Sequence, residues 1–137
     1  MTANSTLEAT TLNHFFNKAT YAPQSTFSIA LLHSNPPNTI TPAGLGTYEA
    51  SYNGYARQNT APVDWNAPSG DDPAIIDNAN VIQYATAGAG ANETVTHFAI
   101  IYGVGNEMLI GALTSPKTIT EGDAPKFDPT QLRATCT

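Results

Sequence analysis

Short runs of alternating apolar and polar residues are the feature that most constrains the fold of this chain. The first clear run covers residues 27–32, where Phe27, Ile29 and Leu31 occupy every second position. This period of two is typical of a β-strand, and the prolines that follow at 36 and 37 end the strand because proline cannot donate to a ladder. Similar runs, separated by clusters of Gly, Pro and Asn, cover residues 48–57, 75–84, 94–102, 107–113, 117–120 and 131–135. Their regular spacing predicts a mainly β fold, a β-sandwich or jelly roll over residues 26–135.

The amino-terminal segment, residues 1–20, has a different pattern. Ser5 and Glu8 match the S-x-x-E capping box, in which both side chains satisfy backbone N–H groups at the start of a helix. Apolar residues then recur about once per turn, at Leu7, Leu12, Phe15 and Phe16. We therefore predict a short amphipathic helix within residues 1–17. We expect its apolar stripe to pack on the protein's own core; packing against a neighbouring subunit is the alternative.

Turns between the predicted strands depend on glycine. Residues 103–106 (GVGN) and 121–123 (EGD) each predict a tight hairpin turn, since glycine adopts a positive φ without steric cost. Gly122 is expected to occupy such a position. No repeat with a period of 20–50 residues is present, and a long fibre shaft needs repetitive sequence. We predict one domain, residues 1–137, which would suit a tip, collar or surface knob.

The charge of the chain disfavours nucleic acid and anionic membranes as partners. Its formal net charge is −6. The five cations are scattered instead of clustered, whereas phosphate binding needs several Lys or Arg side chains together. Charged residues make up 12% of the sequence, against roughly 25% in an average soluble domain. This low value is consistent with a surface that neighbouring proteins cover. Residues 1–17 lack the apolar centre of a secretory signal, so we expect the mature protein to begin at Met1.

Candidate catalytic and metal-binding residues do not form a recognisable pattern. His14, His33 and His97 lie too far apart for a zinc motif. If Phe98 and Ile100 face the core, alternation places His97 on the outer face. The carboxylates of Asp71, Asp72 and Asp77 offer oxygen ligands for Ca²⁺, but their spacing departs from the EF-hand loop. Asp64 and Glu49, each beside an aromatic residue, resemble ordinary loop charges as much as a glycosidase pair.

Cysteine and glycine motifs also give no indication of catalysis. Cys136 is the single cysteine, so no intrachain disulfide can form. We interpret it as a small buried apolar residue. Gly103 and Gly105 lack the third glycine and the following helix of a dinucleotide loop. The sequence therefore predicts no catalytic residues, no cofactor-binding residues and no metal site, and we expect that the protein is not an enzyme.

Five segments together resemble a known family. They are residues 27–33 (FSIALLH), 55–58 (YARQ), 95–100 (VTHFAI), 109–117 (LIGALTSPK) and 118–123 (TITEGD). In this order the chain resembles small phage virion proteins commonly labelled tail fibre proteins. The resemblance covers residues 27 to about 135, and it departs from the family in the acidic, proline-rich region 62–74 and in the helical amino terminus. It implies a structural component of the phage particle, assembled in the host cytoplasm.

Three functions are compatible with this resemblance. The first expectation is a capsid decoration or cement protein that binds the major capsid lattice as a dimer or trimer, because a compact module with few charges suits shallow contact with a lattice. The second is a tail, baseplate or fibre-tip component. The third is a carbohydrate-binding β-sandwich at the host envelope, which would require exposed aromatic residues in one groove, such as Trp65, Tyr48 and Tyr52.

Overall fold

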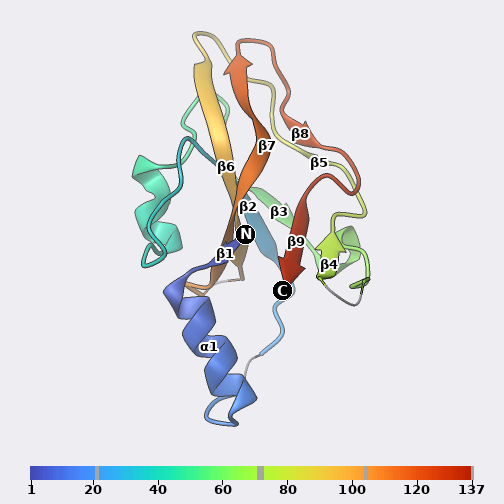
Figure 1. Cartoon of the computed structure of the whole chain (residues 1–137). Coiled ribbons are helices and arrows are strands. Elements are labelled where there is room, and N and C mark those ends of the chain that lie inside the picture. Colours follow the sequence, from blue (N-terminus) through green and yellow to red (C-terminus); the bar gives the residue numbers. More distant parts are fainter. Residues whose placement is uncertain (21, 71–72, 104, 137) are drawn as a thin grey trace.

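A long antiparallel sheet runs through the centre of the protein (Figure 1). The computed structural model describes residues 1–20, 22–70, 73–103 and 105–136, and for Cys136 the backbone alone. The sheet has the strand order β1-β7-β6-β2-β3. In that order its strands are β1 (Thr2–Ala3), β7 (Met108–Thr120), β6 (Asn92–Tyr102), β2 (Phe27–Leu32) and β3 (Gln58–Thr60).

Two short antiparallel ribbons accompany the sheet. One ribbon pairs β4 (Ala74–Asp77) with β9 (Arg133–Cys136), and the other pairs β5 (Ile82–Gln83) with β8 (Lys126–Phe127). Both ribbons pack on one face of the sheet, where Ile82 and Leu132 contact the sheet residues Ile29 and Phe98. The mainly β class with a short amino-terminal helix is thus confirmed. The predicted sandwich consists of one long sheet with two ribbons packed on it.

The other face of the sheet is covered by the segment that follows β2. This segment contains a 3-10 helix, η1 (Pro42–Thr47), whose Leu45 packs on Ala30 and Leu32 of β2. The central strands are therefore buried on both sides. Ala30 is fully buried although strict alternation predicted an apolar face at Ile29 and Leu31 alone. For the same reason His97 of β6 is partly buried instead of lying on an exposed outer face.

Four predicted strands differ from the observed elements. Residues 48–57 form a loop in which Glu49 makes an isolated bridge to Leu32, and Gly54 turns the chain with a φ of 93°. The predicted strand 75–84 is divided into β4 and β5, because buried Asn78 turns the chain between them. The predicted strands 107–113 and 117–120 are one strand, β7. A bulge joins its halves, since residues 113–116 stand opposite Thr96 alone.

The predicted amino-terminal helix is present, but its cap and its packing differ from the prediction. Helix α1 (Ser5–Phe15) begins after Asn4, whose side chain accepts a hydrogen bond from the Leu7 N–H at 3.0 Å. Ser5 is therefore the first helical residue and not the cap. No residue of α1 is buried. The prediction that its apolar stripe packs on the protein's own core is wrong, because α1 projects beyond the end of the sheet (Figure 1).

The turn between β7 and β8 tests the predicted role of Gly122. Its φ is 89°, as expected, and its N–H donates to the Ala87 carbonyl at 2.9 Å. A Cβ at this position would meet no atom within 4 Å, so any penalty comes from the backbone conformation. We expect Gly122→Val to lower the free energy of unfolding by about 1–3 kcal/mol. Chemical denaturation would measure the change.

A second glycine provides the control for this substitution. Gly46 also has open space around it, and its φ lies outside the left-handed region. Gly46→Val should therefore change the denaturation midpoint much less than Gly122→Val. Equal midpoints for the two variants would contradict the assigned role of Gly122. The other predicted turn, residues 103–106, includes Val104, which lies outside the described residues.

Candidate interaction surface

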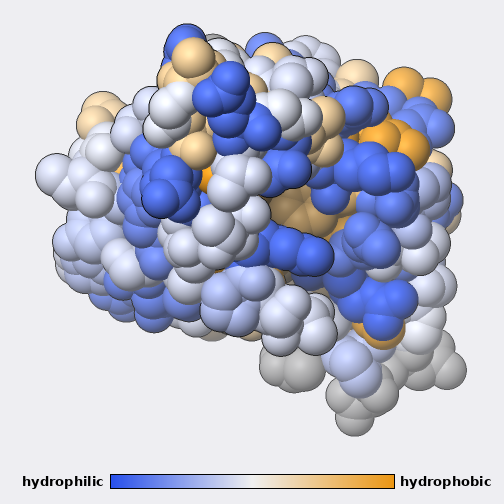
Figure 2. All heavy atoms as spheres, turned by 90° about the horizontal axis from the view of Figure 1, so that it is seen from above, coloured by the Kyte–Doolittle hydropathy of each residue, from blue (hydrophilic) through white to orange (hydrophobic). Residues whose placement is uncertain are grey.

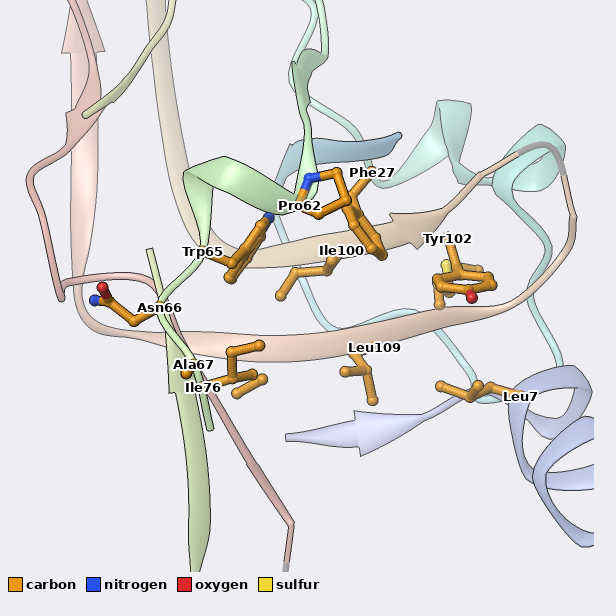
Figure 3. A pocket seen from close by; sticks show the side chains of 12 residues that line it. Leu7, Phe27, Pro62, Trp65, Asn66, Ala67, Ile76, Ile100, Tyr102 and Leu109 are labelled. Atoms are coloured by element: carbon orange, nitrogen blue, oxygen red, sulfur yellow. The ribbon is translucent and has the colours of Figure 1, made fainter. Parts of the chain in front are cut away.

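An apolar groove opens on the face of the sheet that carries the ribbons (Figure 3). Its volume is about 560 Å³, within the roughly 300–1,000 Å³ of typical ligand pockets. Phe27 of β2, Ile100 of β6 and Leu109 of β7 form its floor. These residues share one face because Ile100 pairs with Leu109 and Phe27 pairs with Tyr102. The remaining lining residues are Leu7, Pro62, Trp65, Asn66, Ala67, Ile76, Tyr102, Met108 and Ala134.

The groove exists because the ribbons cover only part of this sheet face. Ile76 of β4 stands at one end, and Leu7 of α1 stands at the other (Figure 3). Ala134 of β9 also lines the groove and pairs with Ile76. Between them the floor stays open. The loop after the short 3-10 helix η2 (Pro62–Asp64) brings Trp65 over Phe27, with ring centroids 6.2 Å apart. These contacts join segments distant in the sequence.

The surface that lines the groove is almost entirely apolar. The Trp65 indole N–H donates to the Thr60 hydroxyl at 3.1 Å, and the Tyr102 hydroxyl donates to the Ala22 carbonyl at 3.2 Å. The polar atoms of both aromatic residues are thus already bonded within the chain. None of the described lining residues is charged. The groove therefore suits an apolar partner, since a polar one would lose hydrogen bonds to water without replacement.

A second apolar surface protrudes next to the groove. On α1, the exposed fractions of Leu12, Phe15 and Phe16 are 59%, 79% and 64%. Their spacing of three and four residues places them on one side of the helix. Leu7 connects this helix to the groove. The end of the molecule farthest from α1 is mostly hydrophilic (Figure 2), whereas these three exposed apolar side chains lie on α1 or directly after it.

Charged residues flank this surface unevenly. Asp64 and Asp77 adjoin the groove residues Trp65 and Ile76 in the chain, and Asp77 lies 3.6 Å from the Arg133 guanidinium. Hydrogen bonds from the Ala61 N–H and the Asn80 amide lower the pKa of Asp64, so this carboxylate is ionised at neutral pH. At the protruding end of α1 the charged residue is Lys18, four positions after His14. Acidic residues thus adjoin both ends of the groove, since Glu8 and Glu107 follow or precede the lining residues Leu7 and Met108, and the cation Lys18 lies at the tip of the helix.

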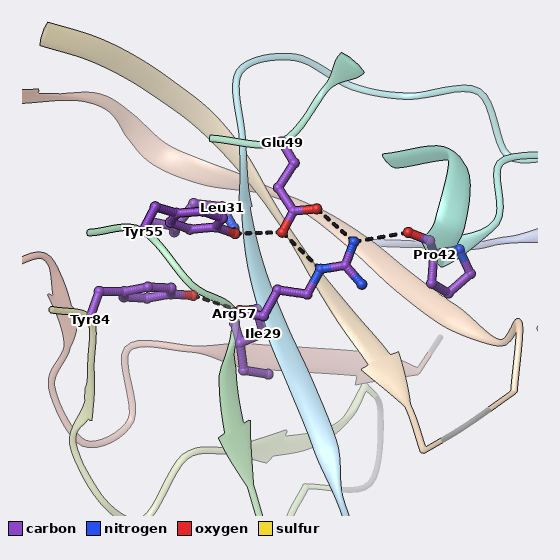
Figure 4. Close-up of polar contacts among 7 residues, drawn as sticks. All are labelled: Ile29, Leu31, Pro42, Glu49, Tyr55, Arg57 and Tyr84. Atoms are coloured by element: carbon purple, nitrogen blue, oxygen red, sulfur yellow. Dashed lines mark hydrogen bonds and ion pairs between the residues drawn. The ribbon is translucent and has the colours of Figure 1, made fainter. Parts of the chain in front are cut away.

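A separate polar cluster joins β2 to the loop that follows η1 (Figure 4). The Arg57 guanidinium donates to both oxygens of Glu49, at 2.8 and 2.6 Å, and to the Pro42 carbonyl at 2.9 Å. The Tyr55 hydroxyl donates to Glu49 at 2.7 Å and accepts from the Leu31 N–H at 3.1 Å. Burial, together with the hydrogen bond to Glu49, raises the pKa of Tyr55 well above its ordinary value. Every member of this cluster has a partner inside the protein, so we assign it a structural role.

We expect Tyr55→Phe to lower the free energy of unfolding by about 1–3 kcal/mol. The substitution removes the hydroxyl that satisfies the Leu31 N–H, and an unsatisfied buried donor has a cost of this size. Chemical denaturation would measure it. Tyr48→Phe serves as a control, since Tyr48 is also half-buried but is outside the cluster. If the two variants lost equal stability, the cluster would have no special role.

The structure brings two of the three histidines near one another. His14 lies on exposed α1, whereas His33 and His97 are both contacted by Thr96. The Thr96 hydroxyl donates to the His33 carbonyl at 2.6 Å and lies 2.8 Å from His97 Nδ1. Across the described residues, no group of three or more His, Cys, Asp or Glu side chains is placed to hold a metal ion.

The other candidate residues are also dispersed. Asp64 caps η2, and Glu49 belongs to the polar cluster. Asp71 and Asp72, proposed with Asp77 as calcium ligands, lie outside the described residues, as does the Cys136 side chain. The aromatic groove required for carbohydrate binding is not formed as predicted. Of the three residues named for it, Trp65 lines the groove, Tyr52 is buried in another cluster and Tyr48 is not among the lining residues.

Comparison with known proteins identifies the family of this chain. The family model described as podophage GP4 fiber I protein gp80 matches residues 2–135, nearly the whole chain. The chain belongs to this family. It is therefore a bacteriophage virion structural protein of the tail-fibre type, and the predicted resemblance is confirmed. No curated protein matches the chain.

Membership of the fiber I family bears on which of the predicted functions is favoured. The family description favours the tail or fibre component over the capsid decoration protein that the sequence first indicated.

In the described part of the chain, no helix has both the length and the apolar character needed to span a membrane. The sequence did not predict that the exposed stripe of α1 and the groove are neighbouring surfaces. The periodic apolar residues of α1 were visible, but their exposure depends on where the helix sits.

Proposed function

We propose that this protein is a structural subunit of the phage tail apparatus, at the fibre or at its attachment, and that it works through protein–protein contacts. The match to the fiber I family over residues 2–135 carries this proposal. The apolar stripe of α1 beside an uncharged groove supports it, because exposed apolar patches of this kind mark sites of protein association.

We further propose that the protein has no catalytic activity. The polar clusters seen in the described residues have clear structural roles: Glu49 and Arg57 hold a loop on the sheet, and Asp64 caps a turn. The groove itself offers no nucleophile with an adjacent base. Assays of glycan hydrolysis with purified protein should give no saturable turnover. A turnover that is lost in Asp64→Asn would contradict this part of the proposal.

Localisation in intact particles tests the proposed place in the virion. Antibodies raised against the purified protein and coupled to gold should label the tail region of negatively stained phage. Label spread over the head would instead support a capsid decoration role and overturn the proposal. As a control, the same antibodies should not label particles assembled without this protein.

A further inference from the structure

We propose that helix α1 of one copy of this protein occupies the apolar groove of a second copy. The inference rests on the proposed function, because a structural subunit acts through such contacts, and it names the partner as another copy of the same chain. Two surfaces on the chain, the protruding α1 stripe and the uncharged groove, carry it.

The shapes of the two surfaces are complementary. Leu12, Phe15 and Phe16 project from α1, and the rings of Phe15 and Phe16 lie 5.3 Å apart as one aromatic unit. The groove is concave, with the Phe27 ring in its floor and the Trp65 ring over it. Aromatic side chains that enter such a pocket supply much of the binding energy of protein interfaces.

Charge favours the helix of a second copy as the occupant. The ionised Asp64 carboxylate and Asp77, which is paired with Arg133, lie beside the groove, and the groove lining carries no charge that would repel an incoming helix. Lys18 follows the apolar stripe at the tip of α1. An α1 inserted with its tip toward Trp65 therefore brings Lys18 toward these carboxylates. Opposite charges at the rim of an apolar contact set its orientation.

The position of the two surfaces permits a closed assembly. Leu7 belongs to α1 and also lines the groove, so the helix that carries the stripe begins at one end of the groove (Figure 3). Copies related by a rotation can then each insert a helix and each receive one. A helix and a groove on opposite faces would instead join copies head to tail, as a ring or an open filament.

Sedimentation at increasing concentration of the full chain tests the inference. Wild type should shift from one copy to a dimer or a larger closed oligomer. The double variant Phe15→Ser/Phe16→Ser removes the inserted side chains and should weaken association at least about tenfold. Ala67→Arg, which places bulk and positive charge in the groove near Trp65, should weaken it similarly. Val81→Ser is the matched control, since Val81 is 47% exposed and is not among the groove residues.

Mixing the two variants makes the test specific. The helix variant retains an intact groove, and Ala67→Arg retains an intact helix, so the mixture should associate more tightly than either variant alone. A monomer at all concentrations would overturn the inference and leave the surface to another virion protein. Association that persists in both variants would also overturn it. Neither result affects the proposed tail location, which gold labelling tests separately.

Discussion

Asn78→Ala should lower the free energy of unfolding by roughly 2–5 kcal/mol. The side chain of Asn78 is fully buried between β4 and β5. Its amide donates to the carbonyls of Asn80 at 2.8 Å and Asp128 at 2.9 Å, and its oxygen accepts from the Leu132 N–H at 2.8 Å. Alanine would leave the Leu132 N–H and the Asp128 carbonyl without these partners, at about 1–3 kcal/mol for each buried group, and would add a cavity.

Asn78 also connects the two ribbons to the groove. Its backbone carbonyl accepts a hydrogen bond from the Thr130 N–H at 2.8 Å. Asn78 also forms an isolated antiparallel β-bridge with Trp65. Trp65 is the single tryptophan of the sequence, so its fluorescence reports on the groove wall during unfolding. Chemical denaturation followed by this fluorescence would measure the loss. Asn92→Ala, at an exposed residue of β6, is the control and should leave the midpoint nearly unchanged. If Asn78→Ala behaved like this control, the proposed role of Asn78 would be wrong.

Asn4→Ala should detach the amino-terminal segment and lower the free energy of unfolding by roughly 2–4 kcal/mol. Asn4 is fully buried, and its oxygen accepts from the N–H groups of Leu7 at 3.0 Å and Met108 at 3.1 Å. Its amide donates to the carbonyls of Ile40 at 3.1 Å and Asn106 at 2.6 Å. One side chain thus caps α1 and anchors it to β7, and its removal leaves several polar groups unsatisfied.

Amide hydrogen exchange would locate this effect. In Asn4→Ala the amides of α1 and β1 should exchange faster, while those of β2 and β6 should stay protected. Asn4→Asp separates the two roles, because it retains the capping oxygen and loses the donors to Ile40 and Asn106. Ser5→Ala is the control: the capping box made Ser5 the predicted cap, yet in the structure Asn4 holds that position. A larger effect from Ser5→Ala than from Asn4→Ala would contradict the assignment.

The proposed contact between copies and the Asn4 anchor are connected. Asn4 holds the first turn of α1 at the edge of the sheet, and the apolar stripe of α1 extends outward from there. A helix of 11 residues is marginal in isolation, since isolated helices shorter than about 12–15 residues are barely stable in water. We therefore expect Asn4→Ala to weaken self-association as well as stability. The floor of the groove, made by Phe27, Ile100 and Leu109, does not contain Asn4 or α1, so the variant should still receive the helix of a wild-type copy, with only the Leu7 end of its groove changed.

Local features of this fold could be predicted from the sequence because short-range preferences determine them. Period-two runs predicted the strands at 27–32 and 94–102, and a capping residue followed by spaced apolar residues predicted the helix. The positive φ of Gly122 was predicted from a glycine between two polar turn residues. The family was also evident in segments such as residues 109–117, because a resemblance of this kind depends only on the order of residues.

The tertiary structure determines the interaction surface and the burial of Asn4 and Asn78. Phe27 meets Tyr102, and Asn78 meets Leu132, only because strands distant in the sequence come together. Whether an apolar side chain is buried depends on what covers it. The second face of β2 is covered by the segment around Leu45, whereas no part of the described chain covers the stripe of α1. Periodicity records which residues share a face, and the long-range pairing of strands determines whether that face lies in the core or is left for a partner.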